Sequence, residues 1–193
     1  MPELYRRDLR SLLEGIADPS PAPGAGAVAG LVTAMAAGVI ASAARRSPAW
    51  PEARGISAQA QALRSRVEKL AEANEQAYLE ALRLLEVPPT GGSRDAAIGK
   101  ALETAADLPL AIAEAAYDVA LLGAEAAEHA VPGCAADGAA ASLLAEAAAR
   151  AAAGLVAANL VSSAGDERVT HAQRLAVAAT DAARRAVAAT APA

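Results

Sequence analysis

A short glycine-containing segment has the composition of a ligand-binding loop. Residues 24 to 30 read GAGAVAG, which superficially resembles the glycine-rich loops that bind phosphate. Those loops follow a β-strand, and the sequence predicts no strand before Gly24. Gly24 and Gly26 instead allow the backbone to approach a ligand, and a helix beginning there would direct unpaired N–H groups and a positive dipole end at it. The alternative is a simple loop without a ligand.

Asp137 is the main candidate for acid–base chemistry. It follows the break at Pro132 and Gly133 and precedes a run of alanines, so its simplest role is a helix N-cap. A carboxylate at such a position can also act as a general acid or base, or hold a cationic group. The two roles are compatible, and the sequence leaves both open.

Other reactive residues give weaker signals. Glu125, Glu128 and His129 share one helix face, but the second matching set that a di-metal bundle needs is missing. We therefore interpret them as surface charge and expect no metal. Cys134 has no histidine near it in the sequence, so it is a poor candidate nucleophile; as the single cysteine it excludes an internal disulfide and suits a reducing compartment.

Composition narrows the class of protein. The 193 residues fit one domain, residues 1–193, and the formal charge of −5 argues against a nucleic-acid partner. The first residues, MPELYRRDLR, do not form a signal peptide, so we expect a cytoplasmic protein.

Alanine is abundant and Phe is absent, so helix is favoured almost everywhere. We expect an all-α fold, an antiparallel bundle of about six helices. The first is short and amphipathic and ends at Asp18. The others are expected at about 26–44, 56–86, 93–130 with a kink or division at Pro109, 137–163 and 167–189.

The uncharged stretch from Ala22 to Ala44 could be mistaken for a membrane span. It is rich in Ala and Gly rather than Leu and Phe, so a buried central helix is the better interpretation. Small residues recur along it at every fourth position: Gly26, Gly30, Ala34 and Gly38. This stripe suits either an intramolecular helix crossing or a subunit interface. Because an alanine core buries little apolar surface, we expect a homodimer.

Four segments in order resemble one known family. They are PAPGAGAVAG, ANEQAYLEALRLLEVP, LPLAIAEAAYDVALL and CAADGAAASLLAEAAARAAAGLVAANL. From about Leu4 into the last helix, the chain resembles the cyclodeaminase domain of the formiminotransferase-cyclodeaminase family, which includes methenyltetrahydrofolate cyclohydrolases.

The family motifs are only partly retained. The retained residues are Pro21, Pro23, Gly24, Gly26, Asp137, Ala140, Ala141, Asn159 and Leu160. Ala25 stands where the family has glycine, Ala27 and Ala136 where it has serine, Leu155 where it has asparagine, and Asn74 where it usually has aspartate.

The resemblance implies an all-helical homodimer that binds a tetrahydrofolate derivative as substrate, without a metal or redox cofactor. Asp137 would be the catalytic acid–base group. Substrate binding would fall to Pro23, Gly24, Gly26 and Asn159, with Arg45 attracting the glutamate carboxylates.

Three hypotheses follow. The first is an enzyme, either formiminotetrahydrofolate cyclodeaminase or methenyltetrahydrofolate cyclohydrolase. The second is a non-catalytic relative that keeps the fold and the dimer and binds folate or a partner protein. The third is an unrelated helical bundle.

Overall fold

The computed structural model describes residues 4–19, 23–86, 93–160 and 165–191. In these ranges every regular element is helical, which confirms the all-α prediction. The elements are η1 (Leu4–Arg6), α1 (Leu9–Ala17), α2 (Ala25–Arg45), α3 (Ala53–Glu86), α4 (Ser93–His129), α5 (Pro132–Asn159) and α6 (Glu167–Ala189).

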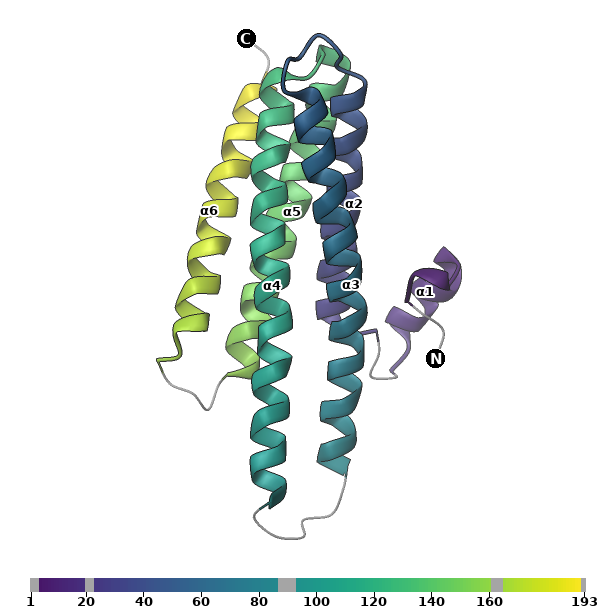
Figure 1. Ribbon diagram of the computed structural model, residues 1–193, viewed down its shortest axis with the longest axis vertical. Coiled ribbons are helices and arrows are strands. Elements are labelled where there is room, and N and C mark those ends of the chain that lie inside the picture. Colours follow the sequence, from purple (N-terminus) through teal and green to yellow (C-terminus); the bar gives the residue numbers. More distant parts are fainter. Residues whose placement is uncertain (1–3, 20–22, 87–92, 161–164, 192–193) are drawn as a thin grey trace.

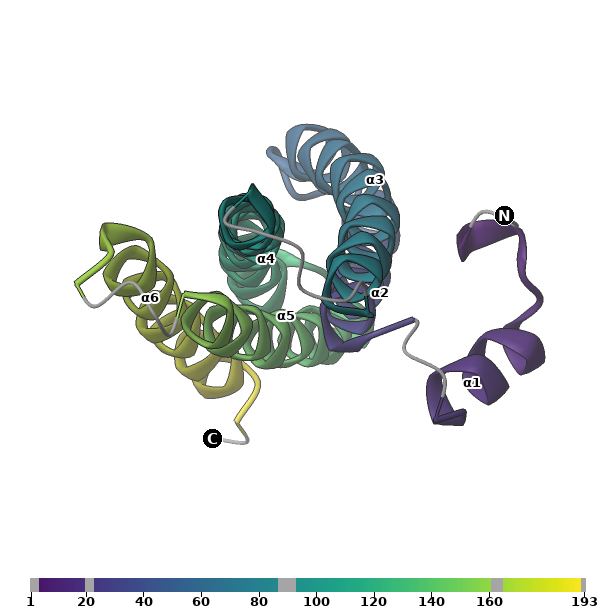
Figure 2. The ribbon, with the colours of Figure 1, turned by 90° about the horizontal axis from the view of Figure 1, so that it is seen from below.

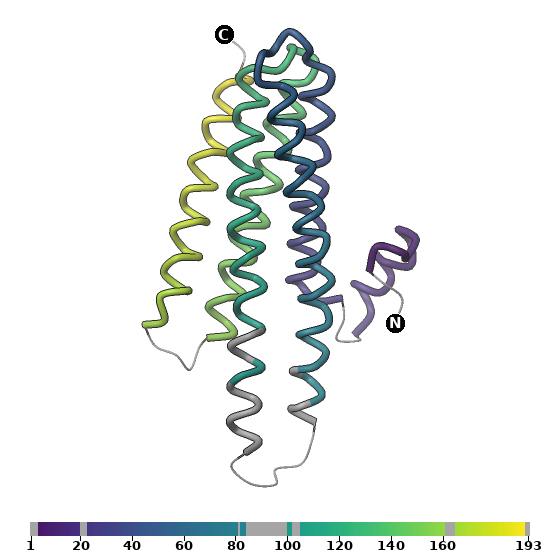
Figure 3. The backbone as a smooth tube through the Cα atoms, viewed as in Figure 1, coloured from purple at the N-terminus to yellow at the C-terminus, as the bar shows by residue number. Residues whose placement is uncertain are grey.

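The long helices run up and down beside one another (Figure 1). Helix α2 packs against α3, α4 and α5, while α6 covers α4 and α5. Viewed along the bundle, α1 stands at the side, away from α4 and α6 (Figure 2). The backbone tube shows that α3 extends beyond the start of α2 (Figure 3).

The core is built mostly from alanine, with larger apolar residues such as Ile40, Ile112 and Val119 fully buried between the helices. Helices with such small side chains must approach closely to exclude water. Glycine makes this possible between α4 and α5: a Cβ on Gly123 would lie 2.8 Å from the backbone nitrogen of Ser142. The Ser142 hydroxyl donates to the Ala120 carbonyl oxygen at 2.8 Å, so this crossing also satisfies its buried polar group.

At Gly26 and Gly30, the small-residue stripe on α2 forms an intramolecular crossing. A Cβ on Gly30 would lie 2.7 Å from the Ala71 Cβ on α3, and a Cβ on Gly26 would overlap the side-chain amide of Asn74. Since α3 of the same chain covers these two positions, they are not available to a second copy.

Helix α1 buries only part of its apolar surface. Leu12, together with Leu4 of η1, packs into a small cluster whose other members are Ala27, Leu31 and Ala71. Leu9 and Leu13 are 63% and 57% exposed. The predicted amphipathic helix is present, but its apolar face is only partly covered by its own chain.

Two helices, α2 and α5, are long and apolar enough to cross a membrane by length and composition. Their most apolar windows are 67% and 50% buried inside the bundle. Helices at the core of a water-soluble bundle have the same properties, so this finding is weak evidence for a membrane span.

Candidate functional site

A cavity of about 250 Å³ lies at the start of α2, where α2, α3, α4 and α5 meet. Each helix contributes at least one residue to its wall. The described lining residues are Gly24, Ala25, Gly26, Asn74, Ala77, Tyr78, Leu82, Ala105, Pro109, Leu155 and Asn159. The predicted substrate-binding residues Gly24, Gly26 and Asn159, which are far apart in the sequence, therefore share one cavity.

Helix α2 presents free backbone donors to this cavity. Gly24 is its N-cap and supplies no side-chain hydrogen bond. The first helical bond joins the Val28 nitrogen to the Gly24 carbonyl oxygen at 3.2 Å, so the N–H groups of Ala25, Gly26 and Ala27 have no acceptor within the described residues. Such groups form a binding site for a hydrogen-bond acceptor.

Asn74 on α3 lies against this first turn of α2. Its side chain is buried, with 9% relative exposure, and it lines the cavity. No hydrogen bond of its amide occurs among the described residues, although a buried unpaired amide costs about 1–3 kcal/mol. Gly26 is required here because any side chain would displace the Asn74 amide. A buried amide of this kind needs a partner from outside the described chain, such as a water molecule, an ion or a ligand.

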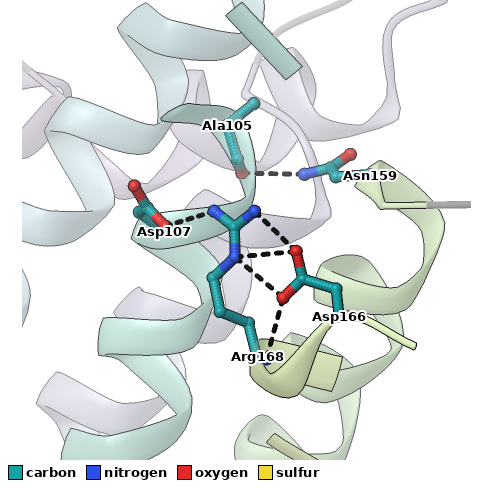
Figure 4. A network of polar contacts seen from close by, with 5 residues as sticks. All are labelled: Ala105, Asp107, Asn159, Asp166 and Arg168. Carbon is teal, nitrogen blue, oxygen red and sulfur yellow. Dashed lines mark hydrogen bonds and ion pairs between the residues drawn. The ribbon is translucent and has the colours of Figure 1, made fainter. Parts of the chain in front are cut away.

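The Asn159 side chain is held by a backbone carbonyl of α4. In an uninterrupted helix the Ala105 carbonyl would accept from the backbone nitrogen of residue 109, but Pro109 has no N–H. The Asn159 side-chain nitrogen donates to that carbonyl at 2.7 Å instead (Figure 4). Helix α4 therefore continues through Pro109 without dividing. This bond uses one of the two N–H groups of Nδ2, so the other N–H can still donate and Oδ1 can accept.

A charged cluster close to Asn159 fixes α6 to α4 (Figure 4). Arg168 donates to Asp107 at 2.8 Å and to Asp166 at 2.8 Å. Asp166 also caps α6 by accepting from the Arg168 backbone nitrogen. The hydrogen bonds from Arg168 lower the pKa of the Asp166 carboxyl.

The described lining of the cavity is nearly neutral. Its polar side chains are Asn74, Tyr78 and Asn159, and no carboxylate or cation is among them. Glu75 follows Asn74 in the sequence but pairs with Arg7 at 3.1 Å. The cavity can therefore bind through neutral hydrogen bonds and apolar contact.

A larger and more open groove of about 650 Å³ adjoins the cavity. It shares Gly24, Ala25 and Tyr78 with the cavity, and its wall includes the buried Pro23, which we predicted to bind substrate. Apolar side chains of α2 and alanines of α5 form most of the remaining wall. An elongated ligand could place one end in the cavity and the rest along the groove.

Asp137 and Arg45 lie elsewhere. Arg45 is at the other end of α2, about 30 Å from its start at 1.5 Å per residue, and lines a separate cavity with Trp50. Asp137 is half-exposed and pairs with Arg46 at 3.4 Å. Within one chain neither residue shares the cavity with Gly24 and Gly26.

The predicted N-cap role of Asp137 is wrong. Helix α5 begins earlier than expected, at Pro132, and its N-cap is Val131. Proline suits the first helical position because its missing N–H would have no helical partner there. Asp137 therefore lies inside the helix.

Glu125, Glu128 and His129 do cluster, with ligand atoms within 4.8 Å of one another. However, Arg185 of α6 contacts Glu125 at 2.6 Å and Glu128 at 2.8 Å. The guanidinium supplies the positive charge that these carboxylates need, which supports their interpretation as surface charge.

Sequence reasoning did not assign Tyr78 or Pro109 to the site, and it noted Asn74 only as a departure from the family. One signal was available: Asn74 and Tyr78 are four residues apart, so they share a face of α3. Pro109 gave no such signal, because its role depends on Asn159 approaching from another helix.

Comparison with known proteins agrees with this architecture. The sequence profile described as formiminotransferase-cyclodeaminase matches residues 8–179. Among solved structures, the formiminotetrahydrofolate cyclodeaminase of Thermotoga maritima superposes with a TM-score of 0.86 at 21% identity, over 97% of this chain and 98% of that one. A comparison with curated protein sequences found no match. Because this profile matches most of the chain, the chain belongs to the formiminotransferase-cyclodeaminase family.

Proposed function

We propose that this protein binds a tetrahydrofolate derivative and processes its one-carbon unit as a formiminotetrahydrofolate cyclodeaminase. The observation that carries the proposal is the cavity at the start of α2. The Asn74 amide and the first N–H groups of α2, which have no partner among the described residues, supply it with hydrogen-bonding groups. Family membership supports folate as the ligand class. The name of the Thermotoga maritima relative supports the deaminase reaction.

The chemistry suits a site that mainly positions its substrate. A nitrogen of the folate attacks the formimino carbon within the same molecule, the C–N bond to the imino nitrogen breaks, and ammonia leaves after that nitrogen gains protons. Holding the two reacting groups in contact supplies a large part of such a rate enhancement. The neutral cavity would bind the ring system, while the adjoining groove would receive the rest of the molecule.

Acid–base assistance from Asp137 requires a second copy of the chain. One chain separates this carboxylate from the cavity by the length of α2, whereas an antiparallel neighbour would place its own opposite end there. We therefore propose Asp137 as a catalytic group only across a subunit interface. Mixed oligomers of Asp137→Asn and Asn74→Leu subunits should then recover activity that each variant lacks alone; no recovery would remove Asp137 from the mechanism.

We place the dimer interface on exposed apolar side chains of α2 and α5. Met35 of α2 and Leu144 of α5 are 54% and 45% exposed, and Val39 and Leu143 are exposed near them in sequence. These four residues, here called the apolar face, lie on two helices that pack together. Apolar surface of this kind is typical of subunit contacts. This proposal keeps the expected homodimer and moves its interface.

The central test is an assay with the purified protein. Formiminotetrahydrofolate is supplied, and ammonia release is followed together with the absorbance of the methenyl product. Turnover that Asn74→Leu reduces at least tenfold, while the matched surface change Gln76→Leu does not, would support the proposal. Methenyltetrahydrofolate is supplied separately, because water opening its bridge would indicate a cyclohydrolase instead.

A second candidate function is folate binding without catalysis. The observation that favours it is the lack of any carboxylate among the described residues of the cavity. Titration with folinic acid separates the candidates: binding without turnover of either substrate supports the non-catalytic function, whereas the absence of both binding and turnover contradicts both. In either case we expect a cytoplasmic protein that needs no metal or redox cofactor.

A further inference from the structure

Another cavity lies where α2 ends and α3 begins, and it is here called the α2–α3 cavity. Its volume is about 680 Å³. The polar side chains of its described lining belong to Arg45, Trp50, Arg54, Ser57 and Gln61, and no carboxylate is among them. The proposed function gives this cavity no role.

Arg45 and Arg54 bring two positive charges to the α2–α3 cavity. Neither guanidinium forms a hydrogen bond or an ion pair with any residue that the structure describes, whereas the neighbouring Arg46 pairs with Asp137 at 3.4 Å. The acidic residue next to them in the sequence, Glu52, is exposed and does not line the cavity. Two like charges that border one cavity repel each other, and an anion between them would replace this repulsion by attraction.

Trp50 adds a buried donor to the same wall. It is 7% exposed, and its ring lies against the His129 ring of α4 with the centroids 5.8 Å apart. The indole N–H can only donate, and it has no acceptor in the described part of the chain. Because a buried tryptophan N–H normally has a hydrogen-bond partner, this one requires an acceptor that the described chain does not supply.

The start of α3 contributes further donors. The first helical bond of α3 joins the Ile56 nitrogen to the Glu52 carbonyl oxygen at 3.0 Å. The backbone N–H groups of Arg54 and Gly55 therefore have no acceptor among the described residues. They stand at the positive end of the α3 dipole, where negative charge is stabilised.

Several acceptors near this cavity are already engaged. The Ser47 backbone nitrogen donates to the Ala44 carbonyl oxygen at 3.0 Å, and the Ser47 hydroxyl donates to the Ala43 carbonyl oxygen at 2.8 Å. Oε1 of Gln61 accepts from Nε of Arg64 at 2.9 Å, which leaves the Gln61 amide nitrogen as a donor. The groups that remain for a ligand are therefore mainly donors and positive charges.

We propose that the α2–α3 cavity binds a phosphate group, with Arg45, Arg54 and Trp50 as its ligand-binding side chains. A terminal phosphate offers three strong acceptor oxygens, whereas a carboxylate offers two. The larger number suits a site with two guanidinium groups, an indole N–H and the first N–H groups of a helix. The phosphate can be inorganic or the end of a larger molecule.

This site is separate from the cavity at the start of α2. The two lie at opposite ends of α2, about 30 Å apart at 1.5 Å per residue, and they share no described lining residue. The inference therefore goes beyond the proposed function and does not depend on it.

Calorimetry with pyrophosphate at pH 7 and constant salt tests the site on the full chain. Arg45→Gln and Arg54→Gln should each weaken binding about tenfold, because each removes charge-assisted hydrogen bonds. Trp50→Phe keeps the ring and removes the indole N–H, so it should weaken binding as well. Arg174→Gln is the control, since Arg174 is an exposed arginine of α6 outside this cavity, and it should leave the affinity unchanged. Thermal melting verifies that each variant is folded.

Two further probes identify the source of the phosphate. Inorganic phosphate and ADP are titrated in the same way: ADP that binds more tightly than pyrophosphate indicates the phosphate end of a larger molecule, and equal or weaker binding of ADP indicates a free phosphate.

The inference is wrong if the full chain does not bind pyrophosphate, or if Arg45→Gln and Arg54→Gln bind it as tightly as the full chain does. It is also wrong if saturating folinic acid, which carries carboxylates of its own, displaces pyrophosphate. In that case the cavity binds the folate, and the proposed function still stands.

Discussion

At the scale of single residues, Asn159 and Asn74 have opposite roles although both are amides that line one cavity. Asn159 completes the structure, because it satisfies the carbonyl that Pro109 leaves without a donor. Asn74 has no such partner among the described residues, so its burial carries an uncompensated cost there. We therefore assign Asn159 to folding and propose that Asn74 serves ligand recognition.

Asn159 compensates for the backbone N–H that Pro109 lacks, and a double-mutant cycle can measure this compensation. Asn159→Ala should lower the free energy of unfolding by about 1–3 kcal/mol, because it leaves the Ala105 carbonyl without its donor. In a Pro109→Ala background the restored backbone N–H takes that role, so the cost of Asn159→Ala should be clearly smaller. Urea unfolding measures both values. If Asn159→Ala costs the same free energy of unfolding in both backgrounds, Asn159 does not compensate for Pro109.

At the scale of helices, close approach decides whether the alanine core is stable. Gly30→Ala should destabilise the protein by about 1–3 kcal/mol, because the new Cβ would lie 2.7 Å from the Ala71 Cβ and push α2 away from α3.

Gly154→Ala on α5 is the matched control. No atom lies within 4 Å of a Cβ placed there, so this change should instead stabilise the protein, by about 0.5–1 kcal/mol. Thermal or urea unfolding of both variants tests the two signs. A destabilising Gly154→Ala would show that helix propensity does not dominate at open positions of this bundle.

The attachment of α6 should depend on pH through Asp166. Hydrogen bonds from Arg168 lower the pKa of this carboxyl below its ordinary value of 3.8. A lowered folded-state pKa contributes stability that is complete above pH 3.8 and is lost as the pH falls through the folded-state pKa.

The measurement compares unfolding of the wild type and of Asp166→Asn from about pH 7 to about pH 3, a range that spans the ordinary carboxyl pKa. The stability difference between them should be constant at the upper end of this range and should shrink below about pH 4. A difference that grows as the pH falls would contradict the assigned ion pair.

At the scale of the whole molecule, the proposed dimer can be tested at its interface. Leu144→Arg places a charge on the apolar face and should shift the protein from dimer to monomer in light scattering coupled to size exclusion. Val177→Arg on α6 is the control, since Val177 is 64% exposed but lies outside that face. If the full chain is monomeric at micromolar concentration, the proposed interface is wrong, and Asp137 has no route to the cavity.

The sequence by itself determined the helices and identified the glycine-containing segment at residues 24 to 30 as part of a possible site. Alanine content and apolar periodicity fix where helices form, because both act locally; the last helix was expected at about 167–189 and is observed at Glu167–Ala189. Local signals were weaker at helix starts, where Pro132 rather than Asp137 begins α5.

Only the tertiary structure decided which residues meet. The sequence left the Gly26 stripe open between two kinds of interface, because small residues permit any close partner, and the fold places α3 there. It also could not show that Asp137 lies at the opposite end from Gly24, since that depends on the direction in which each helix runs. The cavity forms where four helices from distant parts of the chain converge. That Asn74 is buried there without a partner in the described part of the chain follows only from the tertiary structure.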